Sequence, residues 1–491
     1  MSMTSSKPLS IITILIALLV YGGTSQPISA LDDGSESAIA MEDGLIMSSI
    51  IGGSEYDIAY EVEIDRTGNI IVAGETRSTD FPINSSLPST LSGHTDVVVT
   101  KFSPDGTQLL WTKYIGGTIA EHISGLAVTQ GGDVVVCGVT SSADFPVTSG
   151  AYQSTINGGR DAFISRLDGL TGTIVSSTLL GGSDEESVTD LTLTTDGNPV
   201  ICGSTDADDY PTTNGSLQED RKGNADAFVS ILSSDGKNLL ASTYLGRWDY
   251  DWAMGVAVDA RNNVYLTGMT KSNDFPTTEG AYDTTHLGYD EVIVCKLDPD
   301  LTTLLMSTFL GNGFGHSEQG ESIRVDPDGD IVITGVTDNE RFPVTDDALQ
   351  GTYGGDPEDI FIAKFSADGS TLLYCSYIGG NSTERADALV LDDLGNAYTV
   401  GLTRSDDFPT TAGAFRTNGE GYEVFICRIA FSEHGTDLCT LLGASDNDYG
   451  YDIAHRSMGR MVIAGSTKSP DFPLVGGYNQ TNITGSTDMF L

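Results

Sequence analysis

Acidic residues recur at two fixed places along this chain. The first set lies eight residues before each of seven predicted turns and 24 residues before an aromatic–Pro pair: Asp57, Glu121, Glu186, Asp251, Glu318, Glu384 and Asp448. The second set stands at the start of seven predicted strands: Asp96, Asp161, Asp226, Glu291, Asp359, Glu423 and Asp488. Grouped carboxylates could bind a hard cation such as Ca²⁺, which takes six to eight oxygen ligands.

Two interpretations of the first set remain open. In the structural one, each acid accepts hydrogen bonds from loop N–H groups and holds a turn. Repetition in every unit favours this interpretation, because a ligand site seldom needs seven copies. In the other, the acids bind Ca²⁺ together with loops such as residues 181–186 and 446–448, although no EF-hand spacing is present.

Nucleophilic or zinc chemistry has little support. Glu121, His122 and Ser124 resemble a catalytic set only if their side chains meet, and His316 lies beside another acid of the first set. We interpret both histidines as solvated loop residues. No zinc-ligand spacing, Gly-x-Ser-x-Gly motif or phosphate-binding loop stands in the required context, so we assign no catalytic residue and no certain cofactor.

The acids belong to a unit that recurs seven times. Its marker is an aromatic residue followed by proline, at Phe81, Phe145, Tyr210, Phe275, Phe342, Phe408 and Phe472. Successive markers are 64, 65, 65, 67, 66 and 64 residues apart. An acid precedes the aromatic in six units, and Arg341 replaces it in the fifth. A period of this length indicates a repeat array or a propeller rather than separate domains.

Each unit is predicted to contain four strands. In the fourth unit these are 253–259, 264–268, 291–297 and 304–310, from the alternation, the β-branched residues and the Gly, Asp and Asn turns between them. Four short antiparallel strands make one blade of a β-propeller. The first strand is innermost, so we expect the first acid set to ring the channel mouth.

The two ends of the repeat region predict a closed ring. The segment 46–51 resembles a fourth strand standing alone, whereas 487–491 matches only the start of a third strand. Pairing them completes seven blades and leaves no open sheet edge. We therefore predict an all-β protein with one seven-bladed propeller over residues 44–491.

The unit resembles the SBBP (seven-bladed β-propeller) repeat of secreted and cell-surface prokaryotic proteins. The resemblance rests on Leu-Leu-x-Ser-Thr-Tyr-Leu-Gly-Gly, Gly-Asn-x-Tyr, Asp-Phe-Pro-Thr-Thr and Asp-Ala-Phe-Val-x-Lys-Leu elements, closely matched at 243–246, 275–278 and 226–229. Gly246-Arg247 and Gly443-Ala444 each lose one glycine of the usual pair. The resemblance implies the fold and an envelope or surface-layer-like role, and it brings no catalytic motif.

The N-terminus has the pattern of a secretory signal peptide. Lys7 precedes an apolar run from Leu9 to Tyr21, which is too short to span a bilayer as a helix. Ala30 is the expected cleavage point, so we assign 1–30 to the signal peptide, outside the fold, and 31–43 to a short leader. An uncleaved anchor is the alternative. We predict an extracellular or cell-surface location, with no membrane insertion of the mature chain.

Composition excludes several classes of partner. The chain has 24 Lys+Arg and 69 Asp+Glu among 491 residues, a formal net charge of −45. Such a surface repels a phosphate backbone, so nucleic acid is not expected as a partner. Anionic membrane surfaces are disfavoured for the same reason. With 39% apolar residues, the chain has enough hydrophobic content to fold.

The six cysteines occupy positions that hold small residues in other units. Cys137 and Cys202 fall in second strands, Cys295 and Cys427 in third strands, and Cys375 and Cys439 in fourth strands. Small buried cysteines are usual at such packing positions. Only Cys427 and Cys439 share a hairpin, and we favour free thiols there over a disulfide.

These features leave two hypotheses for function. The first is an exported propeller that acts as a monomeric, non-catalytic binding or structural module for a surface protein or glycan. The alternative is an extracellular polysaccharide lyase or hydrolase with its site at the channel mouth, which requires a pocket faced by His122 or His316. In both cases, we expect Ca²⁺ to stabilise some of the acidic loops.

Overall fold

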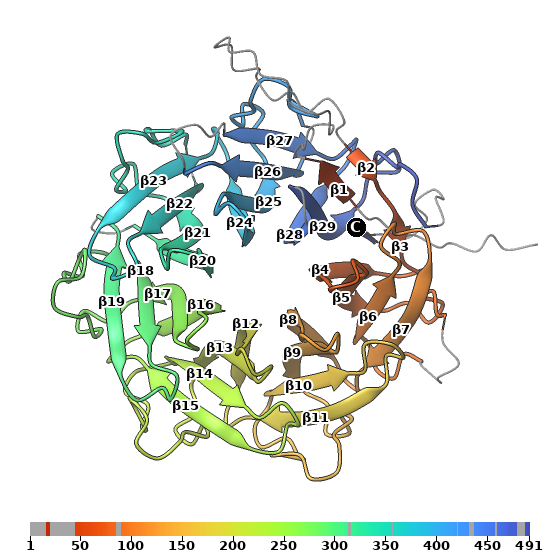
Figure 1. Cartoon of the computed structure of the whole chain (residues 1–491), viewed down its shortest axis with the longest axis horizontal. Helices are drawn as coiled ribbons and strands as arrows, with labels where there is room; N and C mark the ends of the chain where they lie inside the picture. Colours follow the sequence, from red (N-terminus) through yellow and green to blue (C-terminus); the bar gives the residue numbers. More distant parts are fainter. Residues whose placement is uncertain are drawn as a thin grey trace, which may run out of the picture.

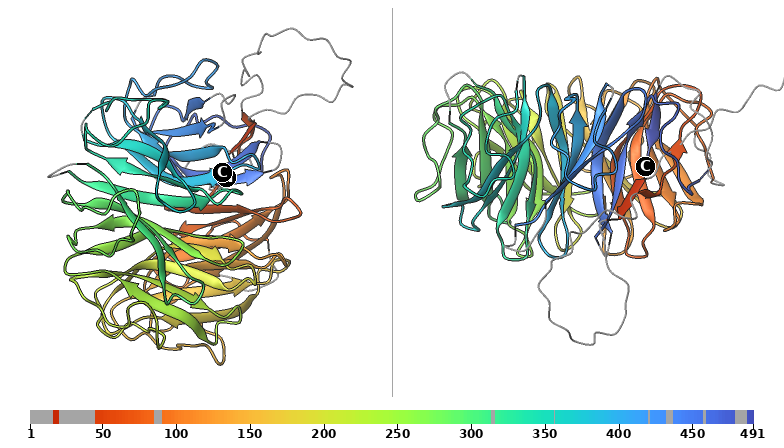
Figure 2. Two further views of the ribbon diagram at one scale, coloured as in Figure 1. Left: turned by 60° about the vertical axis from the view of Figure 1, so that its left-hand side comes forward. Right: turned by 90° about the horizontal axis from the view of Figure 1, so that it is seen from above.

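The computed structural model describes residues 16–19, 45–84, 90–312, 316–355, 357–419, 421–431, 437–456, 459–478 and 487–491. Every regular element in this described part is a β-strand. The strands form seven sheets arranged as a ring, with the first strand of each blade innermost (Figure 1). Seen from the side, the strands cross a disc from one face to the other (Figure 2).

The first six blades have four antiparallel strands in simple meander order. Blade one has β4 (Asp57–Ile64), β5 (Ile70–Thr76), β6 (Asp96–Phe102) and β7 (Leu109–Ile115). Blade two has β8 (Glu121–Val128), β9 (Val134–Thr140), β10 (Asp161–Leu167) and β11 (Ile174–Leu180). Blade three has β12 (Glu186–Leu193), β13 (Pro199–Thr205), β14 (Asp226–Leu232) and β15 (Leu239–Leu245).

The same order continues around the ring. Blade four has β16 (Asp251–Val258), β17 (Val264–Thr270), β18 (Glu291–Leu297) and β19 (Leu304–Leu310). Blade five has β20 (Glu318–Val325), β21 (Ile331–Thr337), β22 (Asp359–Phe365) and β23 (Leu372–Ile378). Blade six has β24 (Glu384–Leu391), β25 (Ala397–Thr403), β26 (Glu423–Ile429) and β27 (Leu438–Leu442). The four-stranded prediction for blade four is therefore confirmed, with its last two strands at the predicted bounds.

Blade seven closes the ring with residues from both ends of the repeat region. It contains β28 (Asp448–Arg456), β29 (Arg460–Thr467) and β30 (Asp488–Phe490). The fourth strand is β3 (Ile50–Ile51), where Ile50 pairs with Phe490 and Ile51 with Met489. The predicted closure by an N-terminal strand agrees with this sheet.

One part of the N-terminus also lies in blade seven. Ile16–Leu19 forms β1, which pairs with Arg460–Ile463 of β29 and with β2 (Leu45–Met47). β30 pairs only with the other half of β29, so this apolar strand covers backbone that β30 leaves unpaired. The structure thus differs here from the expectation that all of 1–30 lies outside the fold. The rest of 1–30, and 31–43, lie outside the described residues.

The repeat marker is a packing anchor. All seven aromatic side chains are buried, with Phe145 at 5% exposure the most accessible. Several stack on the phenylalanine two residues into the third strand; for example, the ring centroids of Tyr210 and Phe228 are 4.5 Å apart. The aromatic side chain of the marker therefore packs into the hydrophobic core between loop and sheet, and it contributes by burying apolar surface.

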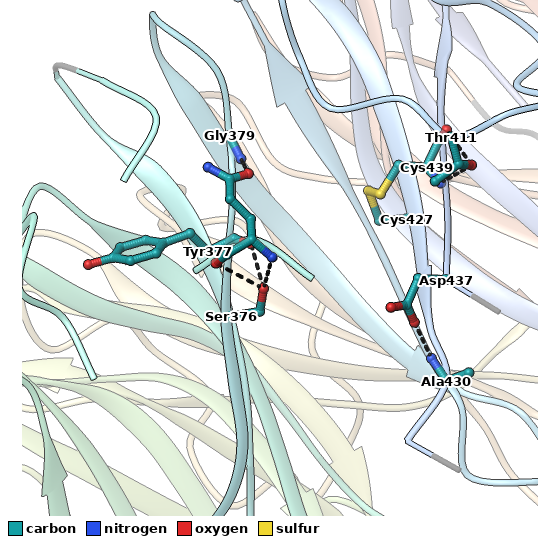
Figure 3. Close-up of a disulfide and its surroundings, with 9 residues drawn as sticks. Ser376, Tyr377, Gly379, Thr411, Cys427, Ala430, Asp437 and Cys439 are labelled. Atoms are coloured by element: carbon teal, nitrogen blue, oxygen red, sulfur yellow. Dashed lines mark hydrogen bonds between the residues drawn. A yellow bond between two sulfur atoms is a disulfide. The ribbon is translucent and has the colours of Figure 1, made fainter. Parts of the chain in front are cut away.

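The cysteine prediction is wrong at one pair. Cys427 and Cys439 lie directly opposite each other on β26 and β27, with Cα atoms 4.2 Å apart, and they form a disulfide (Figure 3). Cross-strand neighbours bring the two sulfurs within bonding distance without moving the backbone. The other four cysteines are buried free thiols, as their small-residue positions predict.

Candidate functional site

The first acid set is buried at the junctions between blades. None of its seven side chains exceeds 1% exposure. Each of six accepts a hydrogen bond from a backbone N–H four residues earlier, in the loop that enters its blade, at 2.7–3.1 Å: from Gly53, Gly117, Gly182, Arg247, Gly380 and Ala444. These bonds give the acids the loop-holding role of the structural interpretation.

The expected ring of acids at the channel mouth is not formed by this set. The carboxylates point into the junctions rather than into the channel, because the first residue of each inner strand faces the loop of the preceding blade. Six of them instead lie beside the same glycine as an acid of the second set. The second set belongs to the third strand of the preceding blade and is also at most 1% exposed.

A glycine directly after six of the fourth strands makes room for these carboxyl pairs. A β-carbon on Gly379 would lie 2.5 Å from Asp359 Oδ1 and 2.9 Å from Glu384 Oε2. A β-carbon on Gly246 would lie 2.8 Å from both Asp226 Oδ1 and Asp251 Oδ2. No real side chain fits at such distances, so the first glycine of the pair is required at both junctions.

Burial raises the pKa values of several of these paired acids, because it disfavours the charged form. Burial, together with the charge of Asp161, raises the pKa of Glu186 to about 8, and burial with the charge of Glu291 does the same for Glu318. Burial also raises the pKa of Asp359 to about 7 and those of Asp251 and Asp448 to about 6. Some junctions therefore hold a proton at neutral pH unless another positive group is present.

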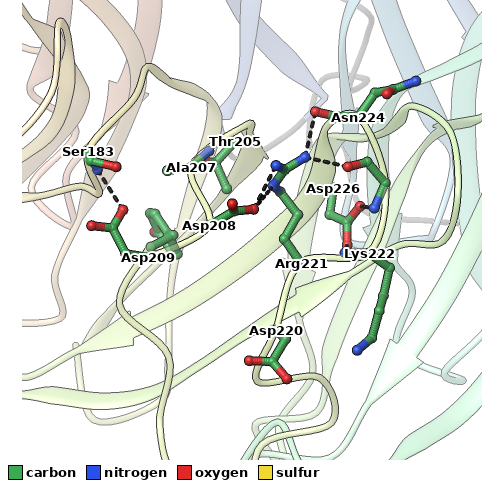
Figure 4. Close-up of polar contacts among 12 residues, drawn as sticks. Ser183, Thr205, Ala207, Asp208, Asp209, Asp220, Arg221, Lys222, Asn224 and Asp226 are labelled. Atoms are coloured by element: carbon green, nitrogen blue, oxygen red, sulfur yellow. Dashed lines mark hydrogen bonds and ion pairs between the residues drawn. The ribbon is translucent and has the colours of Figure 1, made fainter.

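Acids of the second set also organise the loops on this face. Asp226 accepts the backbone N–H of Lys222 at 2.8 Å, and the neighbouring Arg221 pairs with Asp208 at 2.7 Å and donates to Asn224 O (Figure 4). Asp209, from the aromatic–Pro marker, is exposed and accepts the N–H of Ser183 at 2.7 Å. That bond lowers the pKa of Asp209.

A different group of acids lines the channel. A cavity of about 380 Å³ lies among the inner strands, and its lining includes six carboxyl groups: Glu61, Glu63, Asp190, Glu321, Asp387 and Asp452. All six are partly buried, because protein surrounds them while the lumen stays open. Arg324 lines the same cavity and brings a single positive charge among them.

A β-bulge places these side chains. Every inner strand has a register shift at the same position, for example between Ala59 and Glu61 in β4 and between Gly450 and Asp452 in β28. A bulge turns an extra side chain toward one face of the strand. Strict alternation therefore fails here, which is why the sequence did not predict that Glu61, Asp190 and Asp452 line the channel.

Hydrogen bonds hold two of the channel acids between neighbouring blades. Asp452 Oδ2 accepts the N–H of Val62 at 2.7 Å, and Asp190 Oδ2 accepts that of Val256 at 2.8 Å. Asp387 pairs with Arg385. These three acids join adjacent inner strands or a neighbouring side chain, whereas Glu63 Oε2 accepts the N–H of the next residue, Ile64, at 3.2 Å.

Four of the six channel acids have pKa values near neutrality. Burial raises the pKa of Glu63 and Glu321 to about 7 and those of Asp387 and Asp452 to about 6. Burial, then the charges of Asp452 and Asp190, also raise the pKa of Glu61. Clustered acids with raised pKa values in a cavity are typical of functional sites.

Tyrosine rings extend from the channel toward the loops. The centroids of Tyr60 and Tyr451 lie 5.0 Å apart, those of Tyr449 and Tyr451 6.3 Å, and those of Tyr422 and Tyr449 5.5 Å. Tyr451 itself lines the cavity. Aromatic faces beside carboxylates suit a cation that carries apolar surface.

The histidines of the sequence analysis lie away from this cavity. His122 is 3.0 Å from Glu75 Oε1, not beside Glu121, and that hydrogen bond raises the pKa of His122. His316 lies 3.1 Å from Asp338. Neither lines the cavity, whereas Ser124 and His455 do. The set Glu121, His122 and Ser124 is not assembled, because Glu121 is buried at the blade junction and His122, the next strand residue, points to the opposite face and contacts Glu75.

The part of the chain that the structure describes has neither a metal-type cluster nor a membrane-spanning helix. No group of three or more His, Cys, Asp or Glu side chains in the ranges given above is arranged as a metal site. Within the same ranges, the chain has no helix long and apolar enough to cross a membrane.

Comparison with known proteins supports the repeat assignment. A family model described as a beta-propeller repeat, SBBP, matches residues 242–276. No curated protein matches the chain.

Solved structures resemble the chain only distantly. A Dyadobacter fermentans protein of unknown function is 10% identical, with 84% of this chain and 96% of that chain covered and a TM-score of 0.39. BamB from Moraxella catarrhalis is 10% identical over 84% and 98%, with a TM-score of 0.35. Pyrococcus horikoshii acylaminoacyl peptidase is 8% identical over 88% and 53%, with a TM-score of 0.41. The repeat match and the ring of blades identify this chain as a seven-bladed β-propeller that carries the SBBP repeat.

Proposed function

We propose that the protein is an exported binding module whose channel takes a positively charged group of a surface-protein partner, such as a lysine or arginine side chain. The observation that carries this proposal is the cavity of about 380 Å³ with six carboxyl groups and one guanidinium in its lining. An ammonium or guanidinium group pairs with carboxylates and packs on tyrosine faces. The net charge of −45 adds long-range attraction for a basic partner.

Export is supported by the N-terminal pattern and by the chemistry of blade six. The Cys427–Cys439 disulfide is of a kind that persists in oxidising compartments. Cleavage after Ala30 would remove β1 and leave Arg460–Ile463 without that neighbour. N-terminal sequencing of the protein recovered from the medium or cell surface should begin after Ala30. An intact Met1 on an exported chain would instead make the segment an anchor.

Binding is tested by calorimetry with a lysine-rich peptide, an acidic peptide and a neutral oligosaccharide. Only the lysine-rich peptide should bind, and Glu61→Gln should weaken its affinity about tenfold, the loss of one buried charge pair. Glu55→Gln, at an exposed loop position, is the matched control. Binding of the oligosaccharide alone would transfer the site to a glycan partner and reject the proposal.

The affinity measured by calorimetry should depend on pH. The raised pKa values mean that Asp387 and Asp452 ionise near pH 6, and Glu63 and Glu321 near pH 7. Ionised carboxyl groups attract the cation, so its affinity should rise between pH 5.5 and about 7.5. A flat profile would show that the channel acids do not contact the ligand.

A hydrolase or lyase is the second candidate. The observation in its favour is that Glu63 and Asp452 share one cavity with pKa values of about 7 and about 6, which suits one protonated and one ionised partner. Turnover of a polysaccharide that is abolished by Glu63→Gln, at unchanged folding, would establish catalysis and replace the binding proposal.

A further inference from the structure

Basic side chains recur beside one mouth of the channel. The residue directly after the second strand is basic in four blades: Arg77, Lys271, Arg404 and Lys468. Each donates its backbone N–H, at 2.9 Å, to the carbonyl of the residue that precedes an inner strand. These four residues therefore lie at the mouth where the inner strands begin. Arg404, Lys468 and Arg77 belong to blades six, seven and one, which are neighbours in the closed ring (Figure 1).

Stacked tyrosine rings connect this mouth with the cavity. The Arg404 guanidinium lies over the ring of Tyr422, 5.7 Å from its centroid. The Tyr422 ring lies 5.5 Å from that of Tyr449, which lies 6.3 Å from that of Tyr451. Tyr451 lines the cavity, and Tyr60 of blade one packs on it with 5.0 Å between centroids. A continuous aromatic surface thus runs from the acidic cavity to an arginine at the mouth.

Arg77 has a similar arrangement in blade one. Its guanidinium lies 5.1 Å from the ring centroid of Tyr56, and Arg77 Nε donates to Thr95 Oγ1 at 3.1 Å. Arg77 and Arg404 are both exposed. Within the described part of the chain, neither of them forms an ion pair, nor does Lys468. These positive charges are therefore available to a ligand, although the chain as a whole carries a net charge of −45.

The mouth and the lumen have opposite charge. Six carboxyl groups and a single arginine line the cavity, whereas the basic residues stand at the mouth. A guanidinium matches a carboxylate in two parallel hydrogen bonds, and tyrosine O–H groups donate to the same kind of acceptor. Burial raises the pKa of Tyr451 to about 12 and also raises those of Tyr449 and Tyr56, so all three keep their proton at neutral pH. The mouth therefore offers donors to an anion, and the cavity offers acceptors to a cation.

We propose that Arg77 and Arg404 bind the carboxylate of an acidic residue in the same partner segment whose basic residue enters the channel. Successive rings from the cavity to the mouth are 5.5–6.3 Å apart. Because an extended chain advances about 3.3 Å per residue, the acidic residue stands about two to four residues from the basic one. This inference rests on the proposed function, and it adds that the partner segment carries both charges.

The test compares two peptides by calorimetry with the full chain. One has a lysine and a glutamate three residues apart, and the other has glutamine in place of that glutamate. The glutamate peptide should bind about fivefold more tightly at low ionic strength, and salt should reduce this advantage. Arg77→Gln combined with Arg404→Gln should abolish the advantage without weakening the glutamine peptide. Should the double variant fail to fold, Arg404→Gln alone should reduce the advantage.

The matched control is Arg66→Gln. Arg66 is also exposed and belongs to blade one, but it lies in the turn after β4, at the opposite end of that strand. This variant should keep the full advantage of the glutamate peptide. Equal affinities of the two peptides for the wild-type protein would overturn this inference and leave the channel proposal intact. An advantage that persists in the double variant would place the carboxylate elsewhere and overturn the inference as well. If neither peptide bound, the channel proposal and this inference would both fail.

Discussion

Blades four and six carry different chemistry at equivalent positions. In blade six, Arg416 pairs with Glu423, and a disulfide links the third and fourth strands. In blade four, Asp283 replaces the arginine, and Cys295 faces Ser307 with 3.4 Å between Sγ and Oγ. The same backbone therefore tolerates opposite charges at its junctions. Blade six places a guanidinium beside its buried acid, whereas blade four brings the negative charge of Asp283 near Glu291.

The largest expected effect comes from removing the covalent link of blade six. Cys439→Ser should lower the free energy of unfolding by about 3 kcal/mol, because the disulfide closes a loop with a sequence separation of 12. Urea denaturation without reductant measures the change. Ser307→Ala, at the equivalent site of blade four, should change stability by less than about 1 kcal/mol. Equal losses in the two variants would mean that the disulfide adds nothing beyond packing.

Removing the positive charge of blade six comes next. Arg416→Ala should destabilise the protein by about 2 kcal/mol, because it leaves the buried Glu423 without its ion pair; the partial exposure of Arg416 keeps the effect below that of a fully buried pair. Arg416→Gln should recover part of the loss, since glutamine donates to the acid in blades two and three. The comparison between the blades would fail if Arg416→Ala unfolded at the wild-type urea concentration.

The smallest expected effect is a difference in how the melting temperature depends on pH, measured in the presence of chelator. The folded-state pKa of Glu318 is about 8, above its usual 4.5, so its contribution is fully present below pH 4.5 and is lost as pH rises through 8. Glu318→Gln should therefore flatten the fall in melting temperature between pH 7 and pH 8. Asp448→Asn should leave that range unchanged, because the pKa of Asp448 is about 6. If the melting temperatures of both variants fell equally between pH 7 and pH 8, other groups would be responsible for this pH dependence.

The candidate site was predicted only in part. The register of both acid sets followed from repetition, and the loop-holding role followed from the preference of acids for loop N–H groups. Which acid faces which depended on neighbouring blades: Glu291 of blade four meets Glu318 of blade five, 27 residues later. The channel acids were missed because a bulge at Tyr60 and its equivalents breaks the alternation on which the prediction rested.

The amino-acid sequence alone determined the repeat, the four strands of each unit and the closure of the ring. These depend on local alternation, turn residues and the two matching ends, all of which are written in short stretches of chain. The tertiary structure decided which carboxyl groups are buried in pairs, which line the channel and that Cys427 meets Cys439. These depend on the curvature of the ring and on strand bulges, which bring together residues that no local pattern relates.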